Sequence, residues 1–276
     1  MLLKKSRFRE LLLRSITAFF LLVLLFLVVK FLSPAMAMVV VGLLLLLSLW
    51  EWSRLFITLP KSRALDFMIF ASTVLYGVFA WYLPKSQALS VAFVFSGLWA
   101  LVPFSLINYS ASSWSMSNPL AFLGVSCILI GWLSTFWIFR FLGAKFLFWS
   151  VFIIMSMDSC AYFIGTLFGR TPIAPSISPR KSFEGLCGSY IAAVLVLLIS
   201  HLWGIVILPW KFSGADFFIA AIFVSYAVSG DLLESAVKRV SGVKDSGNLL
   251  PGHGGILDRF DSYFSMMPLL FCILNR

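Results

Sequence analysis

The sequence has 276 residues, of which 61% are hydrophobic and only 12% are charged. Soluble globular domains carry about 25% charged residues, so this composition excludes a soluble domain and indicates an integral membrane protein. The formal net charge of +10 would suit a nucleic-acid-binding protein, but the cations lie between long apolar runs, which excludes that class.

The first predicted element is an uncleaved membrane anchor at the N-terminus. Five cations fall within the first 14 residues, ahead of an apolar stretch over 15–33. That stretch is longer than the apolar region of a signal peptide. We therefore expect a retained helix whose amino end lies in the cytoplasm.

Apolar windows long enough to cross a bilayer recur along the chain. A spanning helix needs about 20 apolar residues. Nine such windows predict an all-α, polytopic integral membrane protein with about nine transmembrane helices. The windows are 15–33, 35–53, 65–83, 88–108, 119–139, 145–168, 186–209, 215–237 and 260–275. The stretch from 119 to 168 is nearly continuous, so a miscount is expected there first.

The positions of Lys and Arg predict the orientation, because cytoplasmic loops keep an excess of cations. With nine spans and the amino end inside, 15 cations face the cytoplasm and one, Lys30, lies within the first span. The remaining five face the other side: Lys85, Arg140, Lys145, Lys211 and Arg276. The two longest polar connections of the second half, 169–185 and about 238–259, are then cytoplasmic.

The acids divide the chain into two regions. Residues 1–157 contain three acids (Glu10, Glu51 and Asp66), whereas 158–261 contain the other eight. We predict that residues 1–157 form a scaffold of five to six spans. Whether a lipid enters through this region is left open. The catalytic region is predicted over 158–276, with the loops 169–185 and 238–259.

Isolated cysteines and a histidine within the apolar runs are expected to be structural. The four cysteines lie singly, without metal-ligand spacing, and are interpreted as buried thiols. His201 has no acid nearby in sequence, so we expect a core histidine with its hydrogen bonds satisfied.

The connection after 215–237 is rich in glycine. Five glycines fall between 242 and 255, and Gly254 and Gly255 follow His253. Glycine lets a backbone approach a ligand closely and aim its N–H groups at phosphate oxygens. A flexible connector is also glycine-rich, so the loop alone leaves both interpretations open. His253 is equally open between phosphate or proton chemistry and a loop histidine bonded to backbone.

Two pairs of carboxylates flank this loop. Asp231 and Glu234 lie at the end of one apolar helix, and Asp258 and Asp261 at the start of the next. The spacing of three puts each pair on one helical face. Carboxylates at membrane depth are costly unless paired or metal-bound. Carboxylates holding Mg²⁺ beside cations suit transfer from a nucleoside triphosphate, although no Walker-type P-loop sequence is present. The alternative is a structural clasp with Lys238, Arg239 and Arg259.

The stretch from 235 to 261 resembles the complete signature of the phosphatidate cytidylyltransferases, the CDP-diacylglycerol synthases. The matching positions are Ser235 to Arg239, Lys244, Asp245, Gly247, Leu250, Pro251, His253 to Gly255, Asp258, Arg259 and Asp261. Two upstream stretches resemble the same family: 158–165 (DSCAYFIG) and 177–185 (ISPRKSFEG). In the second, Arg180, Ser182 and Phe183 depart from the usual S-P-K-K-T-W-E-G. The resemblance is strong over about 158–261, whereas 1–157 matches only as a generic multi-span region.

The resemblance implies a membrane enzyme of phospholipid biosynthesis. It would condense CTP with phosphatidic acid to give CDP-diacylglycerol and pyrophosphate, with Mg²⁺ as cofactor. The implied partners are CTP, phosphatidic acid and the lipid bilayer, without nucleic acid, and a homodimer is left open. The alternatives are a CTP-dependent lipid kinase, which would release CDP, and a membrane transporter, which the gathering of acids at one face disfavours. In a bacterium, the inner membrane is expected, with the active site on its cytoplasmic side.

The resemblance and the placement of the charges together give the candidate site residues. Catalytic roles are expected for Asp158, Lys181, Lys244, Asp245 and His253. Substrate phosphates are expected at Arg180, Lys238, Arg239, Gly254, Gly255 and Arg259. Mg²⁺ is expected at Asp231, Asp258 and Asp261, because two helix ends can converge where the loop folds back between them. The alternates Asp245 and Glu234 would instead orient Lys244 and Lys238.

Overall fold

Helices account for most of the chain described by the computed structural model, which covers residues 31, 33–55, 63–107, 118–204, 208–247, 249 and 254–275. The helices are α2 (Pro34–Leu55), α3 (Arg63–Tyr82), α4 (Lys85–Trp99), α5 (Val102–Ile107), α6 (Asn118–Leu142), α7 (Ala144–Phe168), α8 (Phe183–Trp203), α9 (Ala215–Val240) and α10 (Leu257–Leu274). Within these ranges the two strands β1 (Pro172–Ala174) and β2 (Ser178–Ser182) form one antiparallel hairpin.

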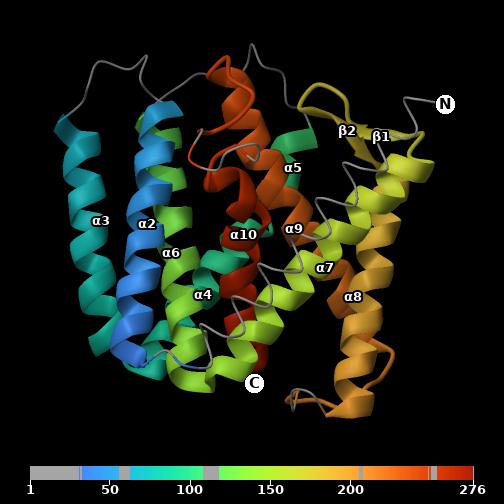
Figure 1. Ribbon diagram of the computed structural model, residues 1–276, viewed down its shortest axis with the longest axis horizontal. Helices are drawn as coiled ribbons and strands as arrows, with labels where there is room; N and C mark the ends of the chain where they lie inside the picture. Colours follow the sequence, from blue (N-terminus) through green and yellow to red (C-terminus); the bar gives the residue numbers. More distant parts are fainter. Residues whose placement is uncertain are drawn as a thin grey trace.

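The long helices run alternately up and down the bundle, which gives it two distinct ends (Figure 1). The hairpin, α5, the end of α9 and the start of α10 lie together at the upper end, which we call the hairpin end. The end of α10 and the connection between α8 and α9 lie at the opposite end. This alternation brings polar segments far apart in sequence to one end.

Eight of the nine predicted spans coincide with helices, which confirms the all-α membrane fold. The first, 15–33, lies outside the described residues, so the count of nine stays a prediction. The window 88–108 is divided by a turn at 100–101 into α4 and α5. Among the described residues, five helices have segments long and apolar enough to cross a bilayer: Pro34–Leu55, Phe122–Leu142, Ala144–Phe168, Phe183–Trp203 and Ala215–Val240.

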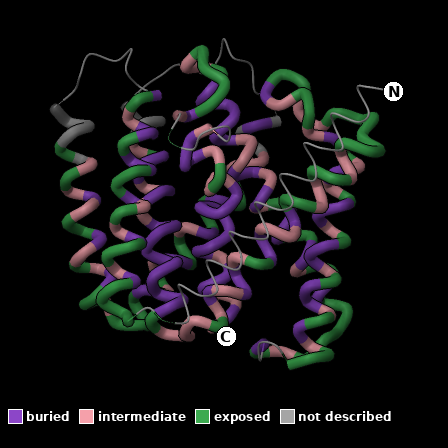
Figure 2. Tube along the Cα trace, viewed as in Figure 1, coloured by how far each residue is buried: buried purple, intermediate pink, exposed green. Residues whose placement is uncertain are grey.

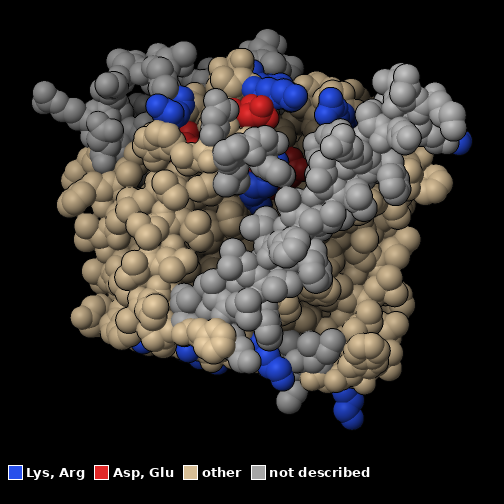
Figure 3. All heavy atoms as spheres, in the orientation of Figure 1, with Lys and Arg blue, Asp and Glu red and all other residues tan. Residues whose placement is uncertain are grey.

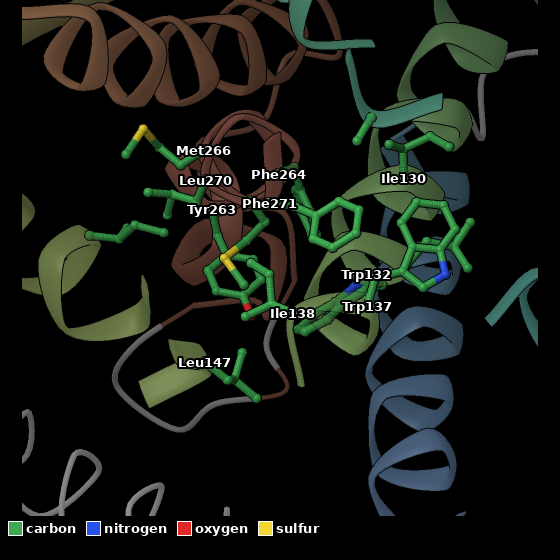
Figure 4. Close-up of a cluster of buried hydrophobic side chains, with 14 of the residues drawn as sticks. Ile130, Trp132, Trp137, Ile138, Leu147, Tyr263, Phe264, Met266, Leu270 and Phe271 are labelled. Carbon is green, nitrogen blue, oxygen red and sulfur yellow. The ribbon is translucent and has the colours of Figure 1, made fainter. Parts of the chain in front are cut away.

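Helix α10 lies at the centre of the bundle, against α4, α6 and α9. The ring centroid of Trp132 on α6 lies 5.4 Å from that of Tyr263 and 5.8 Å from that of Phe264, both on α10. Figure 4 shows these rings facing one another across the two helices. A Cβ at Gly131 would lie 2.7 Å from the Phe264 ring, so glycine permits this close approach. The aromatic contact sets the position of α10 in the bundle.

The predicted boundary at 157 falls within α7, and helices from both sides of it share one hydrophobic core. Buried positions face the middle of the bundle and exposed ones its outside (Figure 2). The exposed positions include large apolar side chains such as Phe70, Phe93 and Phe218, as expected for surfaces in contact with lipid. The division of roles between 1–157 and 158–276 stays a prediction.

The expectation of four buried thiols is wrong in part. Cys127 is buried, Cys160 and Cys272 are half-buried, and Cys187 is exposed. None of the four forms a disulfide. Cys187 lies on the outer side of α8, where the surroundings of an apolar side chain would be lipid and not protein, and apolar sequence alone does not distinguish the two.

His201 has an acidic partner at the opposite end of the bundle. Its Nε2 lies 3.3 Å from Oδ1 of Asp216, which is fully buried. The indole Nε1 of Trp210 donates to the same oxygen at 2.9 Å, and the backbone N–H of Ser213 donates to Oδ2 at 2.7 Å. These contacts join the connection before α9 to the end of α8, consistent with a structural histidine.

Candidate functional site

The hairpin between α7 and α8 is held by the first turn of α8. The carboxylate of Glu184 accepts the backbone N–H groups of Arg170 at 3.0 Å and Thr171 at 3.3 Å, and the Thr171 hydroxyl at 3.2 Å. Ser182 caps α8, because its hydroxyl accepts the N–H of Gly185 at 3.2 Å. The polar stretch 169–185 is therefore an ordered element and not a loose connector.

A cavity of about 500 Å³ lies at the hairpin end, enclosed by the hairpin, α7, α8, α9 and α10. Its apolar wall includes Met155, Leu186, Ala227 and Val228. Figure 3 shows acidic side chains among basic ones at this end, whereas basic ones alone are visible at the opposite end. Seven predicted site residues line the cavity: Asp158, Arg180, Lys181, Asp231, Asp258, Arg259 and Asp261.

Three carboxylates from three helices act on one another in this cavity. Asp158 belongs to α7, Asp231 to α9 and Asp261 to α10, and their charges interact. The Nζ of Lys181 lies 2.6 Å from Oδ2 of Asp231, and the Ser262 hydroxyl donates to Oδ2 of Asp158 at 2.8 Å. Three carboxylates beside one ion-paired lysine make an acidic environment that suits a divalent cation.

The oxygen donors fit Mg²⁺ in kind, but they do not form a complete site on their own. Among the described residues, no group of three or more His, Cys, Asp or Glu side chains is arranged to hold a metal ion. Mg²⁺ usually takes one or two protein carboxylates and completes its roughly six ligands with water and substrate phosphate. The carboxylates would therefore need substrate phosphate and water to complete a Mg²⁺ site, and the metal stays a prediction.

Asp258 is the centre of a separate hydrogen-bond network. Its Oδ1 accepts from Nζ of Lys238 at 2.6 Å. Its Oδ2 accepts the N–H of Ser246 at 3.0 Å, the Ser246 hydroxyl at 3.0 Å and the N–H of Gly255 at 2.8 Å. Burial alone would raise the pKa of Asp258, but the ammonium and these donors outweigh it and hold the pKa below its usual value. Asp258 is thus ionised, and it joins the glycine loop to α9.

Two predicted phosphate ligands, Lys238 and Arg239, do not line the cavity and contact other protein groups instead. Lys238 lies between Asp258 and Glu234, with Nζ 3.2 Å from the Glu234 carboxylate. Arg239 donates to the carbonyl oxygens of Ile177 at 3.2 Å and Val243 at 3.4 Å. The clasp considered from sequence is therefore present for Lys238, whereas Asp231 pairs across the cavity with Lys181.

The remaining candidates lie in the glycine loop. Lys244 and Asp245 are exposed and do not line the cavity. Gly254 has φ of +84°, and a Cβ there would lie 2.8 Å from the Asp258 carboxylate. The N–H of Gly255 is taken by Asp258. His253 lies outside the described residues. The roles predicted for these residues stay predictions.

Two residues that contact the site were missed from the sequence. Ser262 orients Asp158, and Glu51 of α2 accepts the backbone N–H groups of Ile256 and Leu257 at the start of α10. A serine in an apolar helix gives no signal. Glu51 did give a signal in the sequence, because a lone acid near the end of an apolar helix is costly without a polar partner.

Comparison with known proteins identifies a family and several related chains. The family model described as "Cytidylyltransferase family" matches residues 12–276. A phosphatidate cytidylyltransferase of Haemophilus influenzae is 32% identical over 260 residues, 86% of this chain and 88% of that protein. One of Thermotoga maritima is 34% identical over 73% of each chain. One of Bacillus subtilis is 42% identical over 133 residues, about half of each chain.

Proposed function

The chain belongs to the cytidylyltransferase family, and on that premise we propose that the cavity at the hairpin end is the site of cytidylyl transfer. The enzyme transfers the cytidylyl group of CTP to phosphatidic acid, giving CDP-diacylglycerol and pyrophosphate for phospholipid synthesis. The observation that carries the assignment of the cavity is its lining. Residues from 158–165, 177–185 and 235–261, separate in sequence, meet there as carboxylates and cations.

The chemistry requires an oxygen of the phosphatidate phosphate to attack the α-phosphorus of CTP. The bond from that phosphorus to the bridging oxygen breaks, and pyrophosphate leaves. A phosphate monoester is largely ionised at neutral pH, so a strong general base is unnecessary. Catalysis then rests on orienting the two substrates and on stabilising negative charge. Arg180, Lys181 and Arg259 line the cavity and are the cations placed to contact phosphate.

We propose Mg²⁺ as the cofactor, with Asp231, Asp258 and Asp261 as its expected ligands and Asp158 beside them. When bound, the ion would neutralise charge on the triphosphate and on the leaving pyrophosphate. Lys181 lies 2.6 Å from Asp231, and we infer that it orients this carboxylate and meets a substrate phosphate. The apolar wall of the cavity suits the glyceride part of phosphatidic acid.

The products distinguish the proposed reaction from that of a lipid kinase. Purified protein given CTP, phosphatidic acid and Mg²⁺ should incorporate label from the α-phosphate of CTP into lipid and release label from the γ-phosphate in pyrophosphate. Attack at the γ-phosphorus would instead move the γ-label into lipid and release CDP. Thin-layer chromatography of the two labelled reactions resolves these products. Formation of CDP without CDP-diacylglycerol would contradict the proposal.

The orientation in the membrane is also a proposal, supported by the excess of cations in the loops at the hairpin end. Val243 lies in the glycine loop with 39% of its surface exposed, and Gln87 is exposed in the first turn of α4 at the opposite end. Val243→Cys should react with a membrane-impermeant maleimide only from the cytoplasmic side, and Gln87→Cys only from outside. The unsubstituted chain, with its four native thiols, gives the background. The reverse labelling pattern would mean that the cavity faces away from the cytoplasm, where CTP is supplied, and would contradict the proposed orientation.

A further inference from the structure

Glu51 is a fully buried carboxylate in the last turns of α2. It belongs to the part of the chain that matches the family signature only generically. Its hydrogen bonds to described residues are with the glycine loop and the start of α10, about 200 residues later in the sequence. A buried charge persists only where polar partners compensate it.

These partners are the unpaired N–H groups that begin α10. The N–H of Ile256 donates to Oε1 of Glu51 and that of Leu257 to Oε2, both at 2.9 Å. The first N–H groups of a helix have no partner within the helix, and its own N-cap residue, Ile256, offers no side-chain acceptor. A carboxylate at this end also meets the positive end of the helix dipole. Glu51 therefore caps α10 from another helix.

The glycine loop closes tightly around the same carboxylate. A Cβ at Gly247 would lie 2.6 Å from Oε1 of Glu51, and one at Gly255 would lie 2.5 Å from Oε2. Both distances are too short for a side-chain carbon. At Gly255 an added Cβ would also meet the Ser246 hydroxyl and the backbone N of Gly247. The loop backbone therefore packs directly against Glu51 at Gly247, and against Glu51 and the loop itself at Gly255.

Ser246 and Gly255 join Glu51 to Asp258. The Ser246 hydroxyl lies 3.2 Å from Oε2 of Glu51 and 3.0 Å from Oδ2 of Asp258, so it is within reach of both carboxylates. The N–H of Gly255, which packs on Glu51, donates to Asp258. Asp258 in turn binds Lys238. One continuous set of contacts thus leads from α2 to the carboxylate that lines the cavity.

We propose that Glu51 is a positioning residue for cytidylyl transfer, which fixes the start of α10 and thereby the placement of Asp258 and Asp261. This inference rests on the proposed function. Without the carboxylate, two buried N–H groups lose their acceptor and the loop loses the group around which it closes. The start of α10 would then shift or fray, and its acids would no longer be presented to the substrates in one arrangement.

The test compares Glu51→Ala and Glu51→Gln with Tyr76→Phe. Tyr76 lies on α3, is buried and donates its hydroxyl to the backbone carbonyl of Met38 on α2 at 3.1 Å. Loss of this hydroxyl should weaken the packing of α2 on α3 without touching the glycine loop or Trp132. For each variant, the melting temperature, kcat per folded enzyme and the Mg²⁺ concentration for half-maximal activity are measured. Hydrogen–deuterium exchange over 254–258 is measured without substrate.

Glu51→Ala should lower kcat by about tenfold or more, the effect of losing one well-placed interaction, and should raise the Mg²⁺ requirement. Glu51→Gln keeps one acceptor oxygen and should fall between Glu51→Ala and the unsubstituted enzyme. Exchange at 256 and 257 should become faster in both. Tyr76→Phe should lower only the melting temperature.

Equal kcat and Mg²⁺ requirement in all three variants would overturn the positioning role, as would unchanged exchange over 254–258 in Glu51→Ala. If Glu51→Ala does not fold, Glu51→Gln makes the same comparison. If the unsubstituted enzyme forms no CDP-diacylglycerol, the proposed reaction fails. The exchange measurement, which needs no turnover, then decides whether Glu51 holds the start of α10.

Discussion

Asp258→Asn is expected to reduce formation of CDP-diacylglycerol by at least about a hundredfold, because it removes a buried charge with four polar contacts. The amide keeps the size of the carboxylate, but its NH₂ group would face N–H donors or the Lys238 ammonium. Among the described residues, the ion pair with Glu234 would remain for Lys238. Asp261→Asn should have an effect of similar size, since Asp261 lies among the cavity carboxylates. The measurement is the initial rate per folded enzyme over a range of Mg²⁺ concentrations.

Asp216→Asn is the matched control for Asp258→Asn. Asp216 is also a buried aspartate with several donors, from His201, Trp210 and Ser213, but it lies at the opposite end of the bundle. Its substitution should lower the melting temperature while leaving the rate per folded enzyme within about twofold, as for a change remote from the site. If Asp258→Asn and Asp261→Asn both kept near-native, Mg²⁺-dependent activity, the proposed metal ligands would be wrong. These acids would then form a structural clasp with their neighbouring cations.

Lys181→Ala is expected to reduce kcat/KM for CTP by about a hundredfold or more, as loss of a donor to developing charge does. The side chain is 22% exposed, reaches into the cavity and lies 2.6 Å from Asp231. Its removal deletes a phosphate contact and leaves Asp231 without this partner. Steady-state rates at varied CTP concentration give the effect. Lys211→Ala, in the connection before α9 at the opposite end, is the matched control and should be neutral.

A double substitution separates the two roles proposed for Lys181. If Lys181 acts only by orienting Asp231, Lys181→Ala added to Asp231→Asn should cause little further loss, because interacting residues are not additive. If it also contacts substrate phosphate, the double variant should lose more than Asp231→Asn alone. Unchanged CTP turnover in Lys181→Ala would make the 176–185 segment structural.

The positions of the helices and the gathering of the charges could be predicted from sequence for a simple physical reason. Each apolar run must match the bilayer, so successive connections alternate between its two faces. Between the segments that hold Asp158, Lys181, Asp231 and Asp261, the chain is expected to cross the bilayer an even number of times. These residues are therefore expected at the same end of the bundle, and they meet in one cavity. The spacing of Asp258 and Asp261 follows from the helical repeat.

Contacts that depend on tertiary packing could not be predicted in this way. The hairpin over 172–182 shows no alternating pattern in sequence, because its strands have only three and five residues, which is too short to show one. Arg239 donates to the backbone carbonyl of Ile177, and no residue type signals that acceptor. His201 pairs with Asp216, 15 residues away across a loop. Glu51 finds its partners on a helix whose position depends on aromatic packing against α6.

The central place of α10 has a consequence for the assembly of the protein during synthesis. Helix α10 follows α2 to α9 in the chain, so it leaves the ribosome after them, yet its aromatic side chains fill the middle of the bundle against Trp132. The earlier helices are therefore inserted before their common partner exists. Until α10 arrives, Glu51 has no N–H groups to accept and Asp158 lacks the Ser262 hydroxyl. A nascent chain that stops before α10 thus contains most of the membrane-embedded mass of the enzyme but lacks the carboxylates Asp258 and Asp261 that complete its site.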